Sequence, residues 1–187
     1  MSLVTLVVLA SLTSNPEPQK VGVSVGAMYL GAPGANGAAA TAGVRLAMGR
    51  HFALGFDLGW GVVATETVVH DRWWLMPTAA FVIPLGRVRI DVGAGLGFAT
   101  ASGYDSMDQF LAAPFTPVWA FQLVPAARGH VMVAVTLSQR VDVFLRADAG
   151  TLLLQHQAIG FRDNNPNPTP MDTMWFGVNA GVTFGLL

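Results

Sequence analysis

The chain has 187 residues, of which 52% are hydrophobic and only 11% are charged, and its mean hydropathy is +0.50. Soluble domains contain about 25% charged residues, so something other than water must cover part of this protein. The net charge of -1 gives no reason to expect nucleic acid or a polybasic membrane patch. The absence of cysteine excludes disulfides and thiolate metal sites.

Transmembrane helices do not explain this composition. A spanning helix needs roughly 20 mostly apolar residues, but beyond residue 15 Gly, Asp, Arg, Thr or Pro interrupts every apolar run. The 21 glycines and 11 prolines suit strands and turns better than helices. Besides helices, only a closed β-barrel satisfies its own backbone hydrogen bonds in lipid. We therefore predict an all-β, up-and-down antiparallel transmembrane barrel.

The first 15 residues read as a secretory signal. Leu3–Leu12 is an apolar stretch of suitable length, and polar Thr13–Asn15 follow it. No Lys or Arg precedes the apolar stretch, so the alternative is a buried strand or helix of the mature fold. We predict a signal peptide at residues 1–15 and the barrel domain at residues 16–187.

Apolar residues then recur with period two, in segments about as long as a tilted membrane strand needs, about 10 residues. Eight such segments follow in chain order. Their apolar positions are Val21 to Tyr29, Ala40 to Met48, Phe52 to Val62, Trp73 to Ile83, Val88 to Phe98, Val131 to Leu137, Val141 to Ala149 and Met174 to Phe184, every second residue in each. The pattern predicts eight strands, with ten as the alternative.

The other parity of these segments consists of glycine, small polar residues and charges. Small side chains suit a narrow eight-stranded lumen, so we place this face inside and the apolar face against lipid. The predicted lumen charges are Arg45, Asp57, Arg72, Arg89, Asp91, Asp142, Arg146 and Asp148. Buried charges must pair or stay hydrated. They predict a salt-bridge network that fills the lumen; the alternative is a narrow pore with a charged constriction.

The connections are predicted to alternate between short and long. Tight turns at 49–51, 84–86 and 138–140 are assigned to the periplasm, and long loops at 31–39, 64–71, 100–130 and 154–173 to the exterior. The glycine-rich stretch at 31–37 is read as a flexible loop. Within the third loop, Phe115–Leu123 alternates like a strand but is interrupted by prolines, which leaves a strand above the membrane, a folded-in loop or ten strands open.

Aromatic residues fall at both ends of the predicted strands. Such residues form girdles at the two lipid–water interfaces. The predicted girdle consists of Tyr29, Trp60, Trp73, Phe98 and Phe176 at the loop ends and Phe52, Phe81 and Phe184 at the turn ends.

The last strand resembles the outer-membrane assembly signal, through Asn179, Gly181, Phe184 and Leu186. It departs from that signal in the terminal Leu where an aromatic is usual and in one extra residue, Leu187. Over residues 20–187 the chain resembles the small eight-stranded OmpA-like barrels. The resemblance implies a bacterial outer-membrane location, contact with lipid and lipopolysaccharide, and insertion by the barrel-assembly machinery. It implies no particular activity.

Four functional classes remain open from the sequence. The first is a structural or interaction barrel whose exterior loops, such as residues 161–170, bind a protein or surface partner. The others are a narrow passive pore, a soluble lipocalin-like binder and a lipid-modifying enzyme. The enzyme would use His70, His130 or His156 with Ser102, Ser106 or Asp71 at the outer rim, but no Gly-x-Ser-x-Gly motif or lipid A deacylase pattern occurs. We expect no catalytic residue, cofactor or metal.

Overall fold

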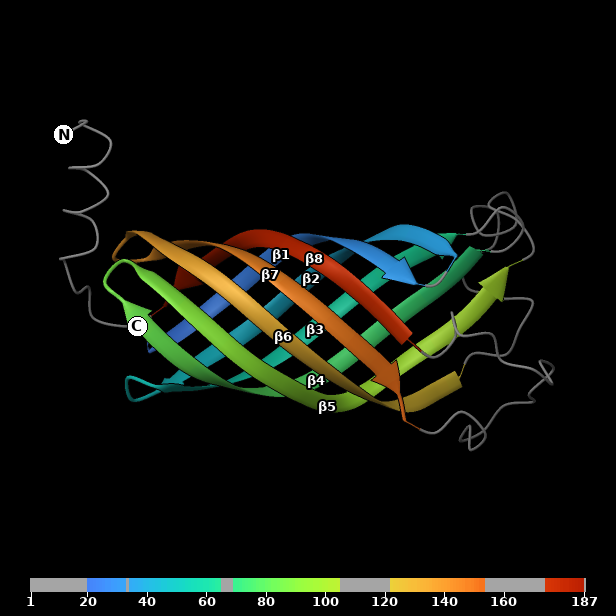
Figure 1. Cartoon of the computed structure of the whole chain (residues 1–187), viewed down its shortest axis with the longest axis horizontal. Coiled ribbons are helices and arrows are strands. Elements are labelled where there is room, and N and C mark those ends of the chain that lie inside the picture. The colour runs from blue at the N-terminus through green and yellow to red at the C-terminus, as the bar shows by residue number, and fades with distance from the viewer. Residues whose placement is uncertain (1–19, 33, 65–68, 105–121, 154–173, 187) are drawn as a thin grey trace.

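The computed structural model describes residues 20–32, 34–64, 69–104, 122–153 and 174–186, which form eight long strands (Figure 1). Their bounds are β1 Val21–Ala32, β2 Ala35–Met48, β3 Phe52–Ala64, β4 Val69–Leu85, β5 Val88–Tyr104, β6 Gln122–Ser138, β7 Val141–Leu152 and β8 Met174–Gly185. The described residues include no helix long and apolar enough to cross a membrane.

The strands form one closed antiparallel barrel in chain order. Each strand pairs with the next, and β1 closes on β8 in the register Val25↔Val182. Closure removes the unpaired edges that an open sheet would present. Strand β5 pairs directly with β6 from Val88↔Val135 to Ala101↔Gln122, so no further strand enters between them. The prediction of eight strands is confirmed, and the alternative of ten is wrong.

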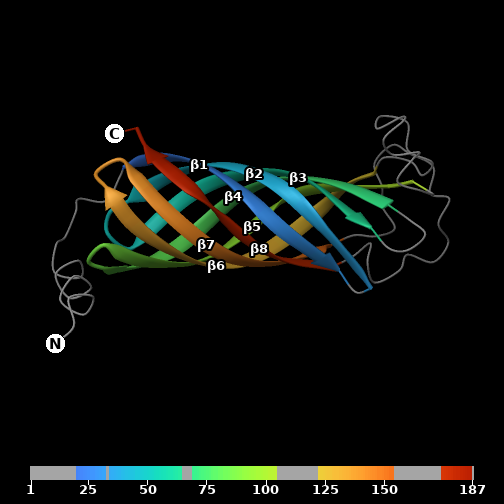
Figure 2. The ribbon, with the colours of Figure 1, turned by 90° about the horizontal axis from the view of Figure 1, so that it is seen from above.

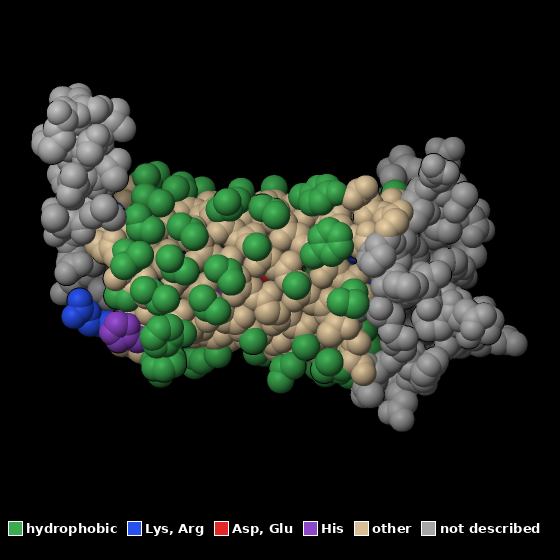
Figure 3. Space-filling model, viewed as in Figure 1, with side chains coloured by type: hydrophobic (Ala, Val, Ile, Leu, Met, Phe, Trp, Pro, Cys, Tyr) green, Lys and Arg blue, Asp and Glu red, His purple; other side chains and the backbone are tan. Residues whose placement is uncertain are grey.

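The apolar parity faces outward, as the alternation predicts. Large hydrophobic side chains are exposed along every strand, for example Phe56 on β3, Leu96 on β5 and Leu145 on β7. They spread over the visible side of the barrel between its two ends (Figure 3). Such a surface is stable only against lipid. The soluble lipocalin-like alternative requires the apolar face inside and is therefore wrong.

The tight turns lie together at one end of the barrel, where β1 begins and β8 ends (Figure 2). We call this the turn end and the opposite one the loop end. Gly49 and Gly86 adopt positive φ angles of 74° and 68° in these turns, a conformation that glycine adopts without strain. From the usual topology of outer-membrane barrels, we expect the turn end to be periplasmic.

The strands extend further at the loop end than the period-two segments indicate. Strands β1 and β2 remain paired up to Ala32↔Ala35, so only positions 33 and 34 separate them. The prediction of a long flexible loop at 31–39 is wrong, because Gly31, Asn36 and Gly37 are ladder residues and Gly34, with φ of 78°, is in the turn. The loop predicted at 100–130 is likewise shorter, because β5 continues to Tyr104 and β6 begins at Gln122. Residues 115–121 lie outside the described part of the chain.

Candidate functional site

The lumen at the turn end contains four charged side chains. Arg89 on β5 pairs with Asp142 on β7, and its Nε lies 3.4 Å from Asp91 Oδ2. Arg45, from β2, places its Nε 3.3 Å from the same Asp91 oxygen. The carboxylates are buried and the arginines nearly so. We call Arg45, Arg89, Asp91 and Asp142 the turn-side quartet; its two arginines and two aspartates make it electrically neutral.

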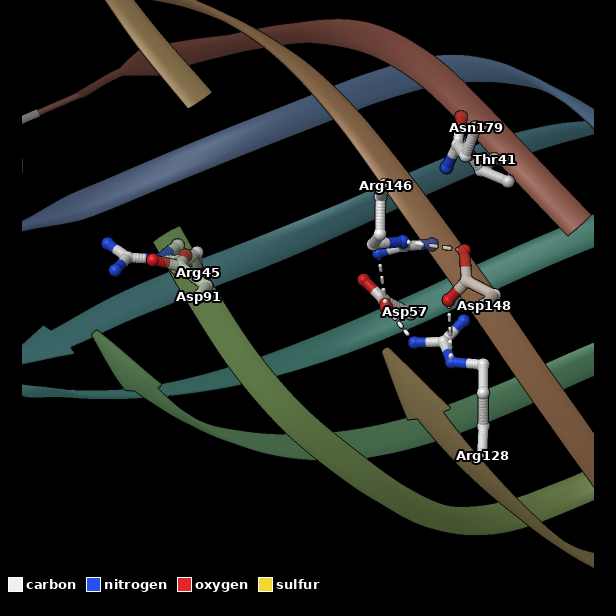
Figure 4. A network of polar contacts seen from close by, with 8 residues as sticks. All are labelled: Thr41, Arg45, Asp57, Asp91, Arg128, Arg146, Asp148 and Asn179. Carbon is white, nitrogen blue, oxygen red and sulfur yellow. Dashed lines mark hydrogen bonds and ion pairs between the residues drawn. The ribbon is translucent and has the colours of Figure 1, made fainter. Parts of the chain in front are cut away.

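A second neutral group, the central quartet, forms a closed ring of ion pairs in the middle of the lumen (Figure 4). Its members are Asp57, Arg128, Arg146 and Asp148. Arg146 Nη1 donates to Asp57 Oδ2 at 2.8 Å and Arg146 Nε donates to Asp148 Oδ2 at 2.9 Å. Arg128 completes the ring, with Nη2 donating to Asp57 and Nε 3.3 Å from Asp148 Oδ1.

The central quartet crosses the lumen from wall to wall. Asp57 is on β3 and Arg146 is on β7, and these strands lie on opposite sides of a closed ring of eight. Asp57 is 13% exposed and Arg128 1%. Direct ion pairs thus join opposite walls of the lumen at this level.

Two members of this region were missed by the sequence analysis. Arg128 was assigned to the third loop, because Pro125 and the small residues around it interrupt the apolar alternation. His130 was considered for the outer rim, but it lies within β6 and pairs in register with Gly93 and Asp148. It is half-buried, and it lines the interior beside Asp57 and Arg146. The useful signal is parity: Arg128 and His130 fall on the inward parity when β6 is extended backward from Val131.

The loop half of the lumen is filled by an apolar cluster rather than by charge. Trp74, Trp175, Leu30 and Met76 are each no more than 2% exposed and belong to it. Met28, Ala32, Ala35, Ala39, Val63, Ala99, Val124, Ala126 and Leu152 complete the cluster. We call this set the apolar plug; no pattern in the sequence predicts it.

Glycines on neighbouring strands make room for the two buried tryptophans. Gly59 is in register with Trp74, and Gly150 with Trp175. A Cβ atom at either glycine would overlap the indole ring beside it. Each indole therefore lies against bare backbone, which lets two of the largest side chains fit within a narrow barrel.

Arg72 is a buried cation that lies against the apolar plug. It is 3% exposed, and its Cζ lies 5.3 Å from the ring centroid of Trp175. This is cation–π distance. The structure thus places Arg72 inside the barrel, against Trp175 of the apolar plug.

A buried amide, Asn179, is in register with Arg146 of the central quartet and with Met28 of the apolar plug. Asn179 Nδ2 donates to Thr41 Oγ1 at 2.9 Å, and both side chains are buried. They come from β8 and β2, on either side of β1, and Gly26 of β1 leaves the space between them. Asn179 therefore has an interior structural role beside its predicted role in the assembly signal, for which Gly181, Phe184 and Leu186 stay predictions.

Little free space remains between the two quartets. A cavity of about 50 Å³ lies there, with Arg45, Asp91, Asp57, Arg146 and His130 in its lining. Such a volume holds at most a few water molecules. The turn-side quartet, the central quartet and the apolar plug thus occupy successive levels of the lumen.

The predicted girdle aromatics all lie on the exterior, where each is 40% exposed or more. At the loop end Trp60 and Trp73 are adjacent, with ring centroids 5.9 Å apart, and Trp60 Nε1 donates to Asp71 Oδ1 at 2.7 Å. At the turn end Phe52 and Phe81 meet edge to face at 5.6 Å. Asp71 therefore accepts a hydrogen bond from an exposed indole at the loop end of the barrel. Of the other proposed enzyme residues, Ser106, His156 and the side chains of His70 and Ser102 lie outside the described part.

No protein-family model and no curated protein sequence matches the chain. Solved structures do match it. Neisserial surface protein A superposes with a TM-score of 0.59 at 12% identity, over 89% of this chain and 96% of that one. The chain has the fold of the small outer-membrane β-barrels.

Other barrels of this fold superpose similarly. The N-terminal barrel domain of Pseudomonas aeruginosa OprF gives a TM-score of 0.53 at 13% identity, over 87% of this chain and 96% of that one. Ail, the attachment invasion locus protein of Yersinia pestis, gives 0.53 at 10% identity, over 88% and 96%. Together with the lipid-facing exterior, this fold places the protein in the bacterial outer membrane, where up-and-down barrels of this size occur.

Proposed function

We propose that the protein is a non-conducting outer-membrane barrel that anchors its long exterior connections at the cell surface. The observation that carries the proposal is the cross-lumen ring of Asp57, Arg128, Arg146 and Asp148, with ion pairs between opposite walls. A pore needs a continuous hydrated path, and this ring interrupts it at mid-height. The apolar plug and the turn-side quartet interrupt it again above and below.

Because three groups interrupt the lumen one after another, conductance measurements test the proposal. The wild-type protein and a Trp74→Ala/Trp175→Ala variant are inserted separately into planar bilayers, and folding of each is verified by its heat-dependent gel shift. We expect no reproducible current steps from either, because removal of the plug leaves both quartets in place. Reproducible unitary steps from the wild-type protein would refute the closed barrel and establish the passive pore.

The anchoring role requires that the barrel fold without the connections at 105–121 and 154–173. The ion pairs and the apolar plug are made by strand residues, so we expect the barrel to fold with either connection replaced by a short Gly-Ser linker. The measurement is the heat-dependent gel shift and the urea midpoint of each linker variant. Loss of the folded form in both variants would show that these connections serve the barrel itself instead of a surface partner.

A further inference from the structure

The net charge of -1 conceals an asymmetry between the ends of the barrel. Among the described residues, every exposed Lys or Arg lies at the turn end, and no Asp or Glu side chain is exposed. We call these cations the basic collar. They are Lys20, Arg50, Arg87 and Arg140. Basic and histidine side chains mark the edge of the turn end in Figure 3.

The collar is distributed around the whole rim. Arg50, Arg87 and Arg140 belong to the β2–β3, β4–β5 and β6–β7 turns, and Lys20 precedes β1. One cation therefore occurs at every second strand of a closed ring. The full circle is covered, with no cation-rich side.

The backbone of the collar is held firmly in place. The carbonyl of Lys20 accepts a hydrogen bond from Ala47 N, that of Arg87 from Thr136 N, and that of Arg140 from Gly185 N, each at 2.8 Å. In the β2–β3 turn the carbonyl of His51, next to Arg50, accepts one from Val82 N at the same distance. Each turn is thereby tied to the following hairpin, so the cations keep a regular spacing.

The collar lies at the boundary of the lipid-facing band. The His51 ring stacks on Phe81 at 5.9 Å, and Phe52 meets Phe81 edge to face at 5.6 Å. Phe184 and Leu85 are also exposed at this level. Long basic side chains next to such a band keep their stems on apolar surface and extend their charges to the headgroups.

The sequence of the opposite end has the reverse sign. The connections at 65–68, 105–121 and 154–173 contain five acidic residues and one Arg. They are Glu66, Asp105, Asp108, Asp163 and Asp172, with Arg162. At the turn end, Glu17 precedes Lys20 in the sequence, so that end has four cations and one acidic residue, against one Arg and five acidic residues in the connections of the loop end.

We propose that the basic collar binds the anionic headgroups of phospholipids in the leaflet at the turn end, a belt of lipid phosphates around the barrel. Arg and Lys are the phosphate-binding side chains, and basic residues at an anionic membrane surface are attracted to it. The encircling distribution matches lipids, which surround a barrel, whereas a folded partner would contact one sector. The inference is independent of whether the lumen conducts.

The test measures lipid selectivity directly. Full-length protein is reconstituted in phosphatidylcholine vesicles with a trace of spin-labelled phosphatidylglycerol or spin-labelled phosphatidylcholine, and the motionally restricted fraction gives the relative association constant. We expect about a twofold preference for phosphatidylglycerol, averaged over all annular lipids, that disappears near 0.5 M salt. The combined variant Lys20→Gln, Arg50→Gln, Arg87→Gln and Arg140→Gln is expected to lose the preference.

A matched variant keeps all four positive charges but exchanges ammonium and guanidinium groups: Lys20→Arg, Arg50→Lys, Arg87→Lys and Arg140→Lys. It is expected to keep the preference, and the gel shift verifies that both variants fold. Equal selectivity in the wild type and the glutamine variant, or no selectivity in the wild type, would overturn the proposal. Sedimentation with purified peptidoglycan sacculi is the second arm. One outcome would overturn the lipid belt and assign the collar to the cell wall. In that outcome the wild type and the matched variant bind the sacculi, the glutamine variant does not, and the wild type shows no lipid selectivity.

Discussion

Neutralising Asp57 is the most informative perturbation of the lumen. Asp57 Oδ2 binds Arg146 Nη1 at 2.8 Å and also accepts from Arg128. The substitution Asp57→Asn keeps the shape of the side chain but leaves two buried arginines facing one aspartate, Asp148. The central quartet changes from neutral to a net charge of +1.

The expected cost follows from the geometry. Two unit charges ~4 Å apart attract by about 4 kcal/mol at an effective dielectric constant near 20, and Asp57 has two such pairs. Against the roughly 8 kcal/mol lost, the variant no longer desolvates a carboxylate, which returns several kcal/mol. We therefore expect the free energy of unfolding to fall by about 3–4 kcal/mol.

The assay is urea unfolding in zwitterionic micelles, followed by tryptophan fluorescence and by the gel shift. Arg140→Gln removes one charge at an exposed turn and serves as the control, with an expected change within about 0.5 kcal/mol. The double variant Asp57→Asn/Arg128→Gln restores neutrality, and we expect it to recover at least about 1 kcal/mol relative to Asp57→Asn. A loss below about 1 kcal/mol for Asp57→Asn, or no recovery in the double variant, would show that water hydrates the quartet and that the lumen is not dry.

Three further substitutions test the exterior and the plug. Phe56→Arg, near mid-height of the lipid face, should lower the free energy of unfolding in vesicles by about 2–4 kcal/mol, and Leu85→Arg, at the turn end, by at most about 1 kcal/mol; equal costs would contradict the assigned depth. Gly150→Val places side-chain atoms in the space of the neighbouring indole and should cost about 1–3 kcal/mol, read as a lower gel-shift temperature; an unchanged temperature would mean that the indole moves freely. Thr41→Val leaves a buried amide without its oxygen partner and should cost about 1–3 kcal/mol, whereas a neutral result in urea unfolding would mean that water replaces the hydroxyl.

The collar shows how a whole-chain quantity can mislead. The net charge of -1 gives no reason to expect a polybasic patch, yet the exposed cations of the described residues all lie at one end. Topology creates this segregation, since an up-and-down barrel returns every second connection to the same end. The residues of the turns, and Lys20 before β1, therefore determine which membrane surface faces the exposed cations.

Strand parity could be predicted from the sequence, and the inside-out barrel followed from it. Alternation assigns each strand residue to one of two faces, and the low charge of the whole chain requires the apolar face to meet lipid. The inward placement of Arg45, Asp57 and Asp142 follows from parity alone. Where prolines and small residues interrupt the alternation, the signal is lost, and for that reason Arg128 and the strand ends beyond Gly31 and Thr100 were misassigned.

The partners of the lumen charges could not be predicted from the sequence. Parity shows that Asp57 points inward, but only the stagger of the closed barrel brings it opposite Arg146, 89 positions away along the chain. The same holds for Trp74 and Trp175, which read as ordinary strand aromatics until closure brings them into one apolar plug against Gly59 and Gly150. The sequence by itself determined which side of each strand meets lipid, because that depends on a local period of two. The tertiary structure decided which lumen charges pair, because pairing depends on contacts across a ring whose stagger no local pattern records.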